Sequence, residues 1–240
     1  PGFSYSTIFA GTSNLLSILT REDDPNHLYI GTMGSNSFGI TEPEELLDPF
    51  TNVTHVWSKE HFKPYEEPKF ARMGKYHAFV ASKRSIWVWG DNQKGQCANE
   101  HPNFVFTPEF MYSFEHPVTK ITSNLDGTIA LTKDGKLHSF GFNNGNLLLH
   151  STKKVIRTPV LVPDDVFVPK PQKPVEIASI SYGISHLSIA TKEGKVYLSG
   201  ENDFCRMGKI GTTHFPTELP MAQKIIQTSS GVFHNIFLAA

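Results

Sequence analysis

The stretch ISYGISHLSIATKEGKVYLSG, Ile180 to Gly200, decides the fold of this chain. It reads as a short strand, a turn with Gly183 and His186, a second strand, a turn that ends at Gly194, and a third strand. Its strand segments are short runs of β-branched and small apolar residues between turn signals, which is typical of strands buried on both faces. The stretch therefore predicts a three-stranded antiparallel unit.

The same pattern recurs along the chain. Copies start near Ile8, Ala71 and Ile121, and a partial copy runs from Ile225 to Ala240. Each full copy ends its third strand with Gly-x-Asn, and the spacing of these glycines is 56, 51 and 59 residues. The expected turn positions are Gly34, Asn36, Gly74, His77, Gly90, Asn92, Gly141, Asn143, Gly183, His186, Gly200, Asn202, Gly231 and His234.

Some copies depart from the pattern. Asn124 stands in place of the turn glycine and Gly127 in place of the turn histidine. The further loop glycine, present as Gly95, comes one residue early as Gly145 and is replaced by Cys205 in the last full copy. We expect two-residue hairpin turns at Asp134-Gly135 and Glu193-Gly194, where glycine supplies a positive φ at low cost.

A unit of 50–60 residues with several strands and fixed turn glycines is typical of a β-propeller blade. We therefore expect an all-β fold, a β-propeller of about four and a half repeats, over one region that spans residues 1–240. The expected units are 8–40, 70–98, 120–150, 177–208 and 225–240, with insertions at 41–69 and 151–176. A short acidic helix is expected after Thr41. The insertions are either variable loops or carriers of a binding surface.

The shared pattern GxSHxxALTxxGxVYxxGxNxxG resembles the repeat of the regulator of chromosome condensation family, which are seven-bladed β-propellers. The resemblance covers about residues 8–40, 70–98, 120–150 and 177–240. Seven blades would need roughly 350 residues or more at this period. We therefore expect a fragment of a longer propeller, and the alternative is a ring of four or five blades.

Composition limits the partners of this chain. Its formal net charge is −1, so no global field draws it to nucleic acid or to an anionic membrane. No apolar run approaches 18 residues, so no membrane span is expected. With only two cysteines and no Cys-x-x-Cys pair, a reducing compartment is expected, which means an intracellular protein of the cytoplasm or nucleus, or of an organelle.

The sequence favours no catalytic, metal or cofactor site. GDNQKGQ, residues 90–96, is not followed by a helix pattern and its Gly-x-Asn recurs, so a repeated turn explains it better than a phosphate loop. The turn histidines recur at one repeat position, which indicates an architectural role. Nothing places a base beside Cys97 or Cys205. We therefore expect a protein that is not an enzyme and holds no cofactor.

Two functions stay open. The first is a protein-interaction module or scaffold within a larger complex, with contact residues beside the repeat turns and with Phe204 and Arg206 exposed as binding anchors. The second, implied by the resemblance, is a guanine-nucleotide exchange factor for a Ran-like small GTPase, for which segment 41–69 is the nearest candidate for a protruding wedge. The candidate contact residues are Asp91, Gln93, Lys94, Glu201, Asp203, Phe204 and Arg206.

Overall fold

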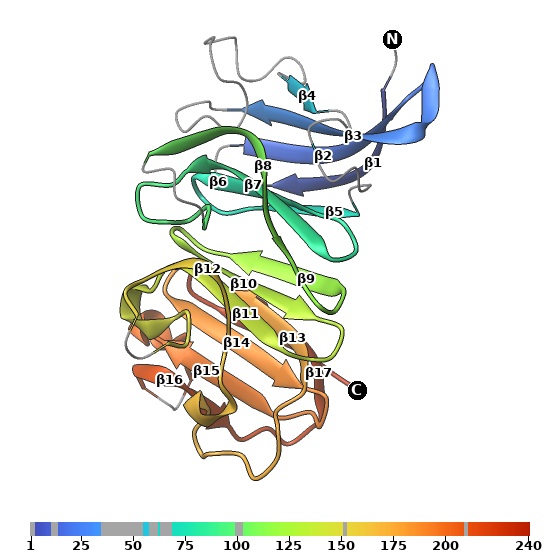
Figure 1. The fold of residues 1–240 in the computed structure, drawn as a ribbon. Coiled ribbons are helices and arrows are strands. Elements are labelled where there is room, and N and C mark those ends of the chain that lie inside the picture. The colour runs from blue at the N-terminus through green and yellow to red at the C-terminus, as the bar shows by residue number, and fades with distance from the viewer. Residues whose placement is uncertain are drawn as a thin grey trace. The chain divides into compact units, whose positions relative to one another are not determined.

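Antiparallel strands make up most of the regular structure that the computed structural model describes (Figure 1). It describes residues 3–10, 14–34, 55–57, 62, 69–98, 103–150, 153–208 and 211–240. In this part of the chain, strands that follow one another in sequence are neighbours in four four-stranded sheets and one two-stranded sheet. The prediction of an all-β propeller fold with about four and a half repeats is confirmed.

We call the sheets blades 1 to 5 in chain order. Blade 1 contains β1 (Phe3–Ala10), β2 (Asn14–Arg21), β3 (Asp24–Gly34) and β4 (His55–Trp57). Blade 2 contains β5 (Phe70–Met73), β6 (His77–Ala81), β7 (Ser85–Asp91) and β8 (Phe104–Ser113). Blade 3 contains β9 (Val118–Ser123), β10 (Gly127–Thr132), β11 (Leu137–Phe142) and β12 (Val155–Leu161). Blade 4 contains β13 (Ile177–Tyr182), β14 (His186–Thr191), β15 (Val196–Gly200) and β16 (Thr213–Leu219), and blade 5 contains β17 (Ile225–Ser230) and β18 (Asn235–Ala239).

The chain divides into two compact units, Pro1–Val118 and Thr119–Ala240. In the first unit, the Arg72 guanidinium of blade 2 lies 4.4 Å from the centre of the Phe9 ring of blade 1. In the second unit, hydrogen bonds join neighbouring blades through their first strands. Tyr182 N–H donates to Thr122 Oγ1 at 2.9 Å. Such contacts between blades are what a propeller needs, because a single blade cannot cover its own faces.

The middle strands are buried on both faces, as their composition predicts. Every residue of β6, β10 and β14 is buried. The outer strand β16 is mostly exposed or half-buried. In β7, Trp87 and Trp89 have no exposed surface, so neither ring is free to stack on a nucleic-acid base.

The hairpin turns are loops of three residues, so the expectation of two-residue loops is wrong. Thr132 N–H donates to the Lys136 carbonyl, and Gly135 N–H donates to the Thr132 carbonyl, which leaves three residues in the loop. Thr191, Gly194 and Lys195 repeat the arrangement. The glycines have φ of +80° and +93°, so each loop is a tight turn followed by a left-handed residue.

The segment 151–176 contains more than a connection. Its residues 155–161 form β12, the fourth strand of blade 3. Beyond the 3-10 helix η3 (Asp164–Val166), Val168 forms a parallel bridge with Thr217 of β16. The connection thus runs along the outer strand of blade 4 and covers part of an edge that would otherwise be open to pairing.

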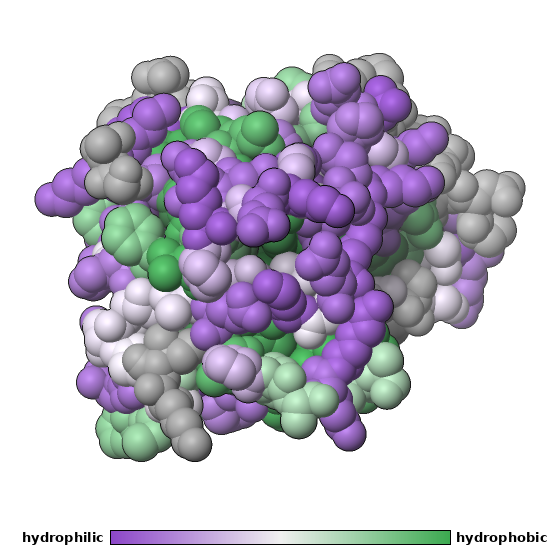
Figure 2. Space-filling view, turned by 90° about the horizontal axis from the view of Figure 1, so that it is seen from below, coloured by the Kyte–Doolittle hydropathy of each residue, from purple (hydrophilic) through white to green (hydrophobic). Residues whose placement is uncertain are grey.

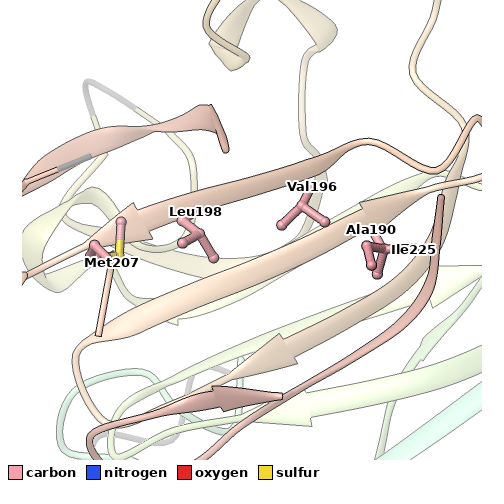
Figure 3. Close-up of a cluster of buried hydrophobic side chains, with 5 residues drawn as sticks. All are labelled: Ala190, Val196, Leu198, Met207 and Ile225. Carbon is pink, nitrogen blue, oxygen red and sulfur yellow. The ribbon is translucent and has the colours of Figure 1, made fainter. Parts of the chain in front are cut away.

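One hydrophobic core cluster of the second unit is shared by blades 4 and 5. Ala190, Val196, Leu198, Met207 and Ile225 form one buried cluster (Figure 3). Burying a side chain the size of Val, Leu, Ile or Met stabilises a fold by about 1.5–3 kcal/mol. Blade 5 is therefore fixed to blade 4 by apolar burial as well as by hydrogen bonds.

Candidate functional site

The glycine that ends the third strand of each full blade has a positive φ. The values are +113° at Gly34, +112° at Gly90, +102° at Gly141 and +123° at Gly200. A Cβ at Gly200 would lie 2.3 Å from the Ser185 carbonyl oxygen, and one at Gly141 would lie 2.5 Å from the Asp126 carbonyl oxygen. Both the conformation and the close backbone approach therefore require glycine.

The asparagine two residues later organises the loop that follows. Its side-chain oxygen accepts a hydrogen bond from the backbone N–H five residues further on. The pairs are Asn92 with Cys97 at 2.9 Å, Asn143 with Leu148 at 2.8 Å, and Asn202 with Met207 at 2.7 Å. Asn36 lies outside the described residues. These three loops therefore share one backbone frame, so their side chains can be compared position by position.

The Gly-x-x-His turns have a common backbone bond as well. The N–H of Gly74, Gly183 and Gly231 donates to the carbonyl of His77, His186 and His234, and Asn124 N–H donates to the carbonyl of Gly127. His186 Nε2 lies 3.1 Å from Asn235 Oδ1. Burial lowers the pKa of His77 to about 3 and lowers the pKa of His186 as well. Both imidazoles are therefore neutral near pH 7.

Of the three candidate contact residues in blade 2, two are exposed and one is buried. Gln93 and Lys94 are exposed on the loop after β7. Asp91 is buried, and its carboxylate accepts hydrogen bonds from Gln93 N–H at 2.9 Å and from Gln96 Nε2 at 3.0 Å. The expectation that Asp91 presents its side chain to a partner is wrong, because the carboxylate is used to hold its own loop.

Blade 4 presents three of its four candidate residues. Glu201, Asp203 and Phe204 are exposed, and they lie around the 3-10 helix η4 (Asp203–Cys205). The fourth, Arg206, was expected to be exposed, and this is wrong, because its side chain is only 3% exposed. It faces the neighbouring blade instead of solvent.

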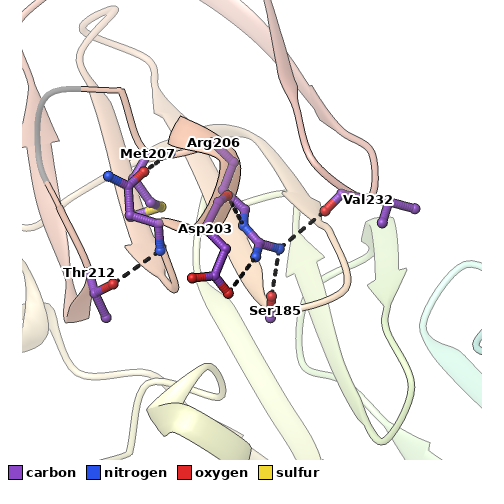
Figure 4. A network of polar contacts seen from close by, with 7 residues as sticks. Ser185, Asp203, Arg206, Met207, Thr212 and Val232 are labelled. Carbon is purple, nitrogen blue, oxygen red and sulfur yellow. Dashed lines mark hydrogen bonds and ion pairs between the residues drawn. The ribbon is translucent and has the colours of Figure 1, made fainter.

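The Arg206 guanidinium joins blade 4 to blade 5 (Figure 4). It donates to Ser185 Oγ at 2.7 Å and to the Val232 carbonyl at 3.2 Å. It also donates to the backbone carbonyl and the carboxylate of Asp203. Its carbon Cζ lies 5.6 Å from the centre of the Phe233 ring. These partners stand on turns and on η4, so Arg206 fixes the loops of two blades against one another.

Beside Arg206, an aromatic pair stands on the surface. Phe204 is 75% exposed and Phe233 is 51% exposed, and their ring centres lie 4.6 Å apart. Phe204 and Cys205 have φ of +59° and +58°, at positions where Gly145 and Asn146 have +60° in blade 3. Bulky side chains rarely adopt this conformation. Phe204 is one of the contact residues predicted from the sequence, whereas Phe233 is not.

We call this surface the turn face. It comprises the turns and loops at 124–126, 143–150, 183–185, 201–208 and 231–234 in the second unit. The exposed apolar residues Ile184 and Val232 also lie on it. Figure 2 shows one side of the molecule, which is not specific to the turn face, and there hydrophilic side chains cover much of the surface with hydrophobic ones in smaller separate areas.

Other residues that suggest chemistry are placed as follows. Cys97 is buried, which raises the pKa of its thiol, and Cys205 is exposed.

Segment 41–69 lies outside the described residues except for β4, Phe62 and Lys69, so the helix and the wedge expected there are not described. In the described ranges, no three His, Cys, Asp or Glu side chains are grouped to hold a metal ion. The described chain also has no helix long and apolar enough to cross a membrane.

Comparisons with known proteins agree with the repeat pattern. No protein-family model matches the chain. The human (Homo sapiens) E3 ubiquitin-protein ligase HERC2 is 27% identical over 128 residues, which cover 53% of this chain and 2% of HERC2. The mouse (Mus musculus) secretion-regulating guanine nucleotide exchange factor is 25% identical over 171 residues, 67% of this chain and 34% of that protein. The chain therefore spans about a third or less of these relatives.

Solved structures show the same fold. A crystal structure of Prp20p from Saccharomyces cerevisiae, described with its binding properties to Gsp1p and histones, matches with a TM-score of 0.70 and 16% identity over 97% of this chain and 55% of that one. In the structure of Kap60 bound to yeast RCC1 (Prp20), the match has a TM-score of 0.72 and 17% identity over 100% of this chain and 56% of that one. The repeat, the blades and these likenesses together show that the chain is similar in sequence to proteins with regulator of chromosome condensation repeats and is built from the same kind of β-propeller blade.

Proposed function

We propose that the chain is a protein-interaction module whose binding surface is the turn face of blades 4 and 5. The observation that carries this proposal is the exposed pair of Phe204 and Phe233, with ring centres 4.6 Å apart. Aromatic side chains held rigidly at a surface are favoured as anchors of protein interfaces. Here the buried Arg206 holds the turn that carries Phe233.

The conformation of Phe204 supports the proposal. A left-handed φ costs a bulky residue on the order of 1–2 kcal/mol, and glycine or asparagine would avoid it. The ring gains little burial in return, since it is 75% exposed. Binding energy from a partner would compensate for such an arrangement. Around it, the exposed Glu201 and Asp203 would form a polar rim.

Gln93 and Lys94 are the exposed candidate contact residues of blade 2. They form a separate candidate surface in the first unit. The partners proposed are proteins, such as subunits of a larger complex, within a reducing intracellular compartment, in keeping with two free cysteines. Neither this function nor its alternative needs covalent chemistry by the chain.

The test is affinity capture with the full chain and its Phe204→Gly variant. Gly fits the left-handed φ, so the variant keeps the backbone and removes only the ring. We expect partners held in fixed ratio by the wild type to be lost with Phe204→Gly and kept with Lys192→Ala, which changes an exposed residue on the β14–β15 turn. Equal capture by the two variants and the wild type would refute the turn face as the binding surface.

The second candidate is guanine-nucleotide exchange on a Ran-like small GTPase, favoured by the mouse exchange factor among the relatives. An exchange factor acts by binding the nucleotide-free GTPase more tightly than the loaded one, which is a shift of populations. Capture in EDTA and again with excess GTP separates the two functions. A small GTPase held only in EDTA supports exchange, whereas partners indifferent to nucleotide support the interaction module alone.

A further inference from the structure

A small hollow lies between blades 3 and 4 on the turn face. Its volume is about 70 Å³. That is room for a few water molecules or for the end of one side chain, and far below the 300–1,000 Å³ typical of small-molecule sites. Its lining includes Asp126, Asn144, Leu147, Ile184 and Glu201.

The same place between blades 4 and 5 is filled by a guanidinium. Leu147 and Arg206 stand at equivalent positions, each four residues after the loop asparagine (Asn143 and Asn202). Their backbones have the same conformation, with φ, ψ of −73°, −11° at Leu147 and −63°, −20° at Arg206. One junction therefore carries an arginine and the other a shorter, uncharged leucine.

The groups that accept hydrogen bonds from Arg206 have counterparts around the hollow. By the repeat alignment, Asp203 corresponds to Asn144, Ser185 to Asp126, and Val232 to Ile184. All three counterparts line the hollow. The change from Ser185 to Asp126 puts a carboxylate, on a residue that is 9% exposed, where the other junction has a hydroxyl. A carboxylate binds a guanidinium more strongly than a neutral acceptor does.

Other polar groups near the hollow make hydrogen bonds of their own. Asn124 Nδ2 donates to the Ile184 carbonyl at 3.2 Å, which uses one of the two lone pairs of that oxygen. His214 Nδ1 lies 3.2 Å from the Gly145 carbonyl oxygen. Glu201 adds a second carboxylate at the exposed side of the hollow. The charged side chains of the lining therefore favour a cation.

We infer that the hollow between blades 3 and 4 receives an arginine side chain of a protein partner, in the way that the junction of blades 4 and 5 holds Arg206. This rests on the proposed interaction function and adds the chemistry of the partner. The partner segment would place an apolar group on the Phe204–Phe233 pair and an arginine in the hollow beside it.

The test uses N-acetyl-arginine methylamide as the probe, with the citrulline analogue as a control of similar size without charge. Both are titrated into the full chain labelled with ¹⁵N. We expect saturable shifts of the backbone amide signals of Asp126, Gly145 and Ser185 with the arginine probe only. Shifts no larger than those with citrulline would overturn the inference.

Two variants make the test specific. Leu147→Arg should fill the hollow with the chain's own guanidinium and weaken the probe by about tenfold, the size expected for charge-assisted hydrogen bonds. Lys192→Ala, which changes an exposed residue on the β14–β15 turn, is the control and should leave binding unchanged. Asp126→Asn, which keeps the shape and removes the charge, should weaken the probe as well. Unchanged binding in both Leu147→Arg and Asp126→Asn would overturn the inference.

The outcome can be separated from that of the proposed function. The arginine probe needs no partner, so its failure beside intact, Phe204-dependent capture would overturn the hollow alone. Capture that does not depend on Phe204 would instead refute the turn face as the interaction surface. If a second copy of the chain filled the hollow, sedimentation would show self-association that Leu147→Arg abolishes, and the assignment to a different protein would be wrong.

Discussion

Gly183 lies directly against the imidazole of His186, so that a Cβ at Gly183 would stand 2.3 Å from His186 Cε1. The same Cβ would stand 2.6 Å from the Gly231 carbonyl oxygen, which belongs to the backbone of blade 5. The glycine is thus required by packing against the histidine ring and the next blade.

This relationship predicts that Gly183→Ala destabilises the chain by about 1–3 kcal/mol, the usual range for overpacking. Gly231→Ala should be milder. Its Cβ would meet the ring of His234 at 2.4 Å, but that side chain is exposed and can turn away. Urea unfolding of the two variants measures the difference. Equal losses would mean that burial of the ring does not matter.

The buried histidine of blade 2 predicts a dependence on pH. His77 has no exposed surface, and burial lowers its pKa to about 3, against about 6.5 in the unfolded chain. Below pH 6.5 the unfolded state therefore binds a proton that the folded state excludes, and stability is lost as the pH falls. From pH 6.5 to 5 the free energy of unfolding should drop by about 2 kcal/mol through this residue.

Comparison of the wild type with His77→Gln isolates this effect. The variant lacks the titrating group, so its free energy of unfolding should fall less steeply between pH 6.5 and pH 5. The slope, and not the absolute stability, is the quantity to compare, because the substitution has its own effect on packing. Parallel curves for the two proteins would contradict the prediction.

The turn glycines and the strands were readable from the sequence because they depend on local conformation. A positive φ at Gly90 or Gly200 is set by the turn itself, and the buried runs of β10 and β14 follow from their apolar composition. The loop length at Gly135 was misjudged, since an Asp-Gly pair fits a two-residue loop and a three-residue loop equally well.

The burial of Arg206 could not be predicted from its neighbours in the sequence. Its acceptors are on Ser185 and Val232, 21 and 26 residues away, and they meet it only when two blades pack together. Asp91 was misjudged for a similar reason, because its acceptor role depends on how the loop folds back to Gln96. The sequence does contain one signal for the unusual position of Phe204. Aligning the loops by their asparagines places Phe204 opposite Gly145, which marks it as a residue in a glycine position.

The left-handed backbone at Cys205 predicts that glycine is more stabilising than alanine at this position. It has a φ of +58° at the repeat position where Gly95 has +77°. Cys205→Gly should be more stable than Cys205→Ala by about 1 kcal/mol, because only glycine adopts this conformation without strain. The side chain is exposed, so neither variant loses packing. Thermal unfolding of the pair under reducing conditions checks the order, and a more stable alanine variant would contradict it.

Arg206 and Lys195 allow a buried cation to be compared with an exposed one in the same unit. Arg206 is 3% exposed and donates to Ser185, Val232 and Asp203, whereas Lys195 is 48% exposed and meets Glu218 at 3.2 Å. Arg206→Met should lower the free energy of unfolding by about 2–4 kcal/mol, since it leaves acceptors of two turns without their donor. Lys195→Met should lower it far less than Arg206→Met does, because water screens the pair and solvates Glu218 afterwards.

Urea unfolding of both variants, with the wild type as reference, measures these losses. A loss at Arg206 as small as that at Lys195 would mean that the junction of blades 4 and 5 is held by the apolar cluster around Ile225 alone. It would also weaken the argument that the equivalent hollow at Leu147 favours a guanidinium, because the two junctions are compared through the strength of the Arg206 contacts. A large loss at Arg206 would show that such a junction holds a guanidinium firmly, as the inference for the hollow requires.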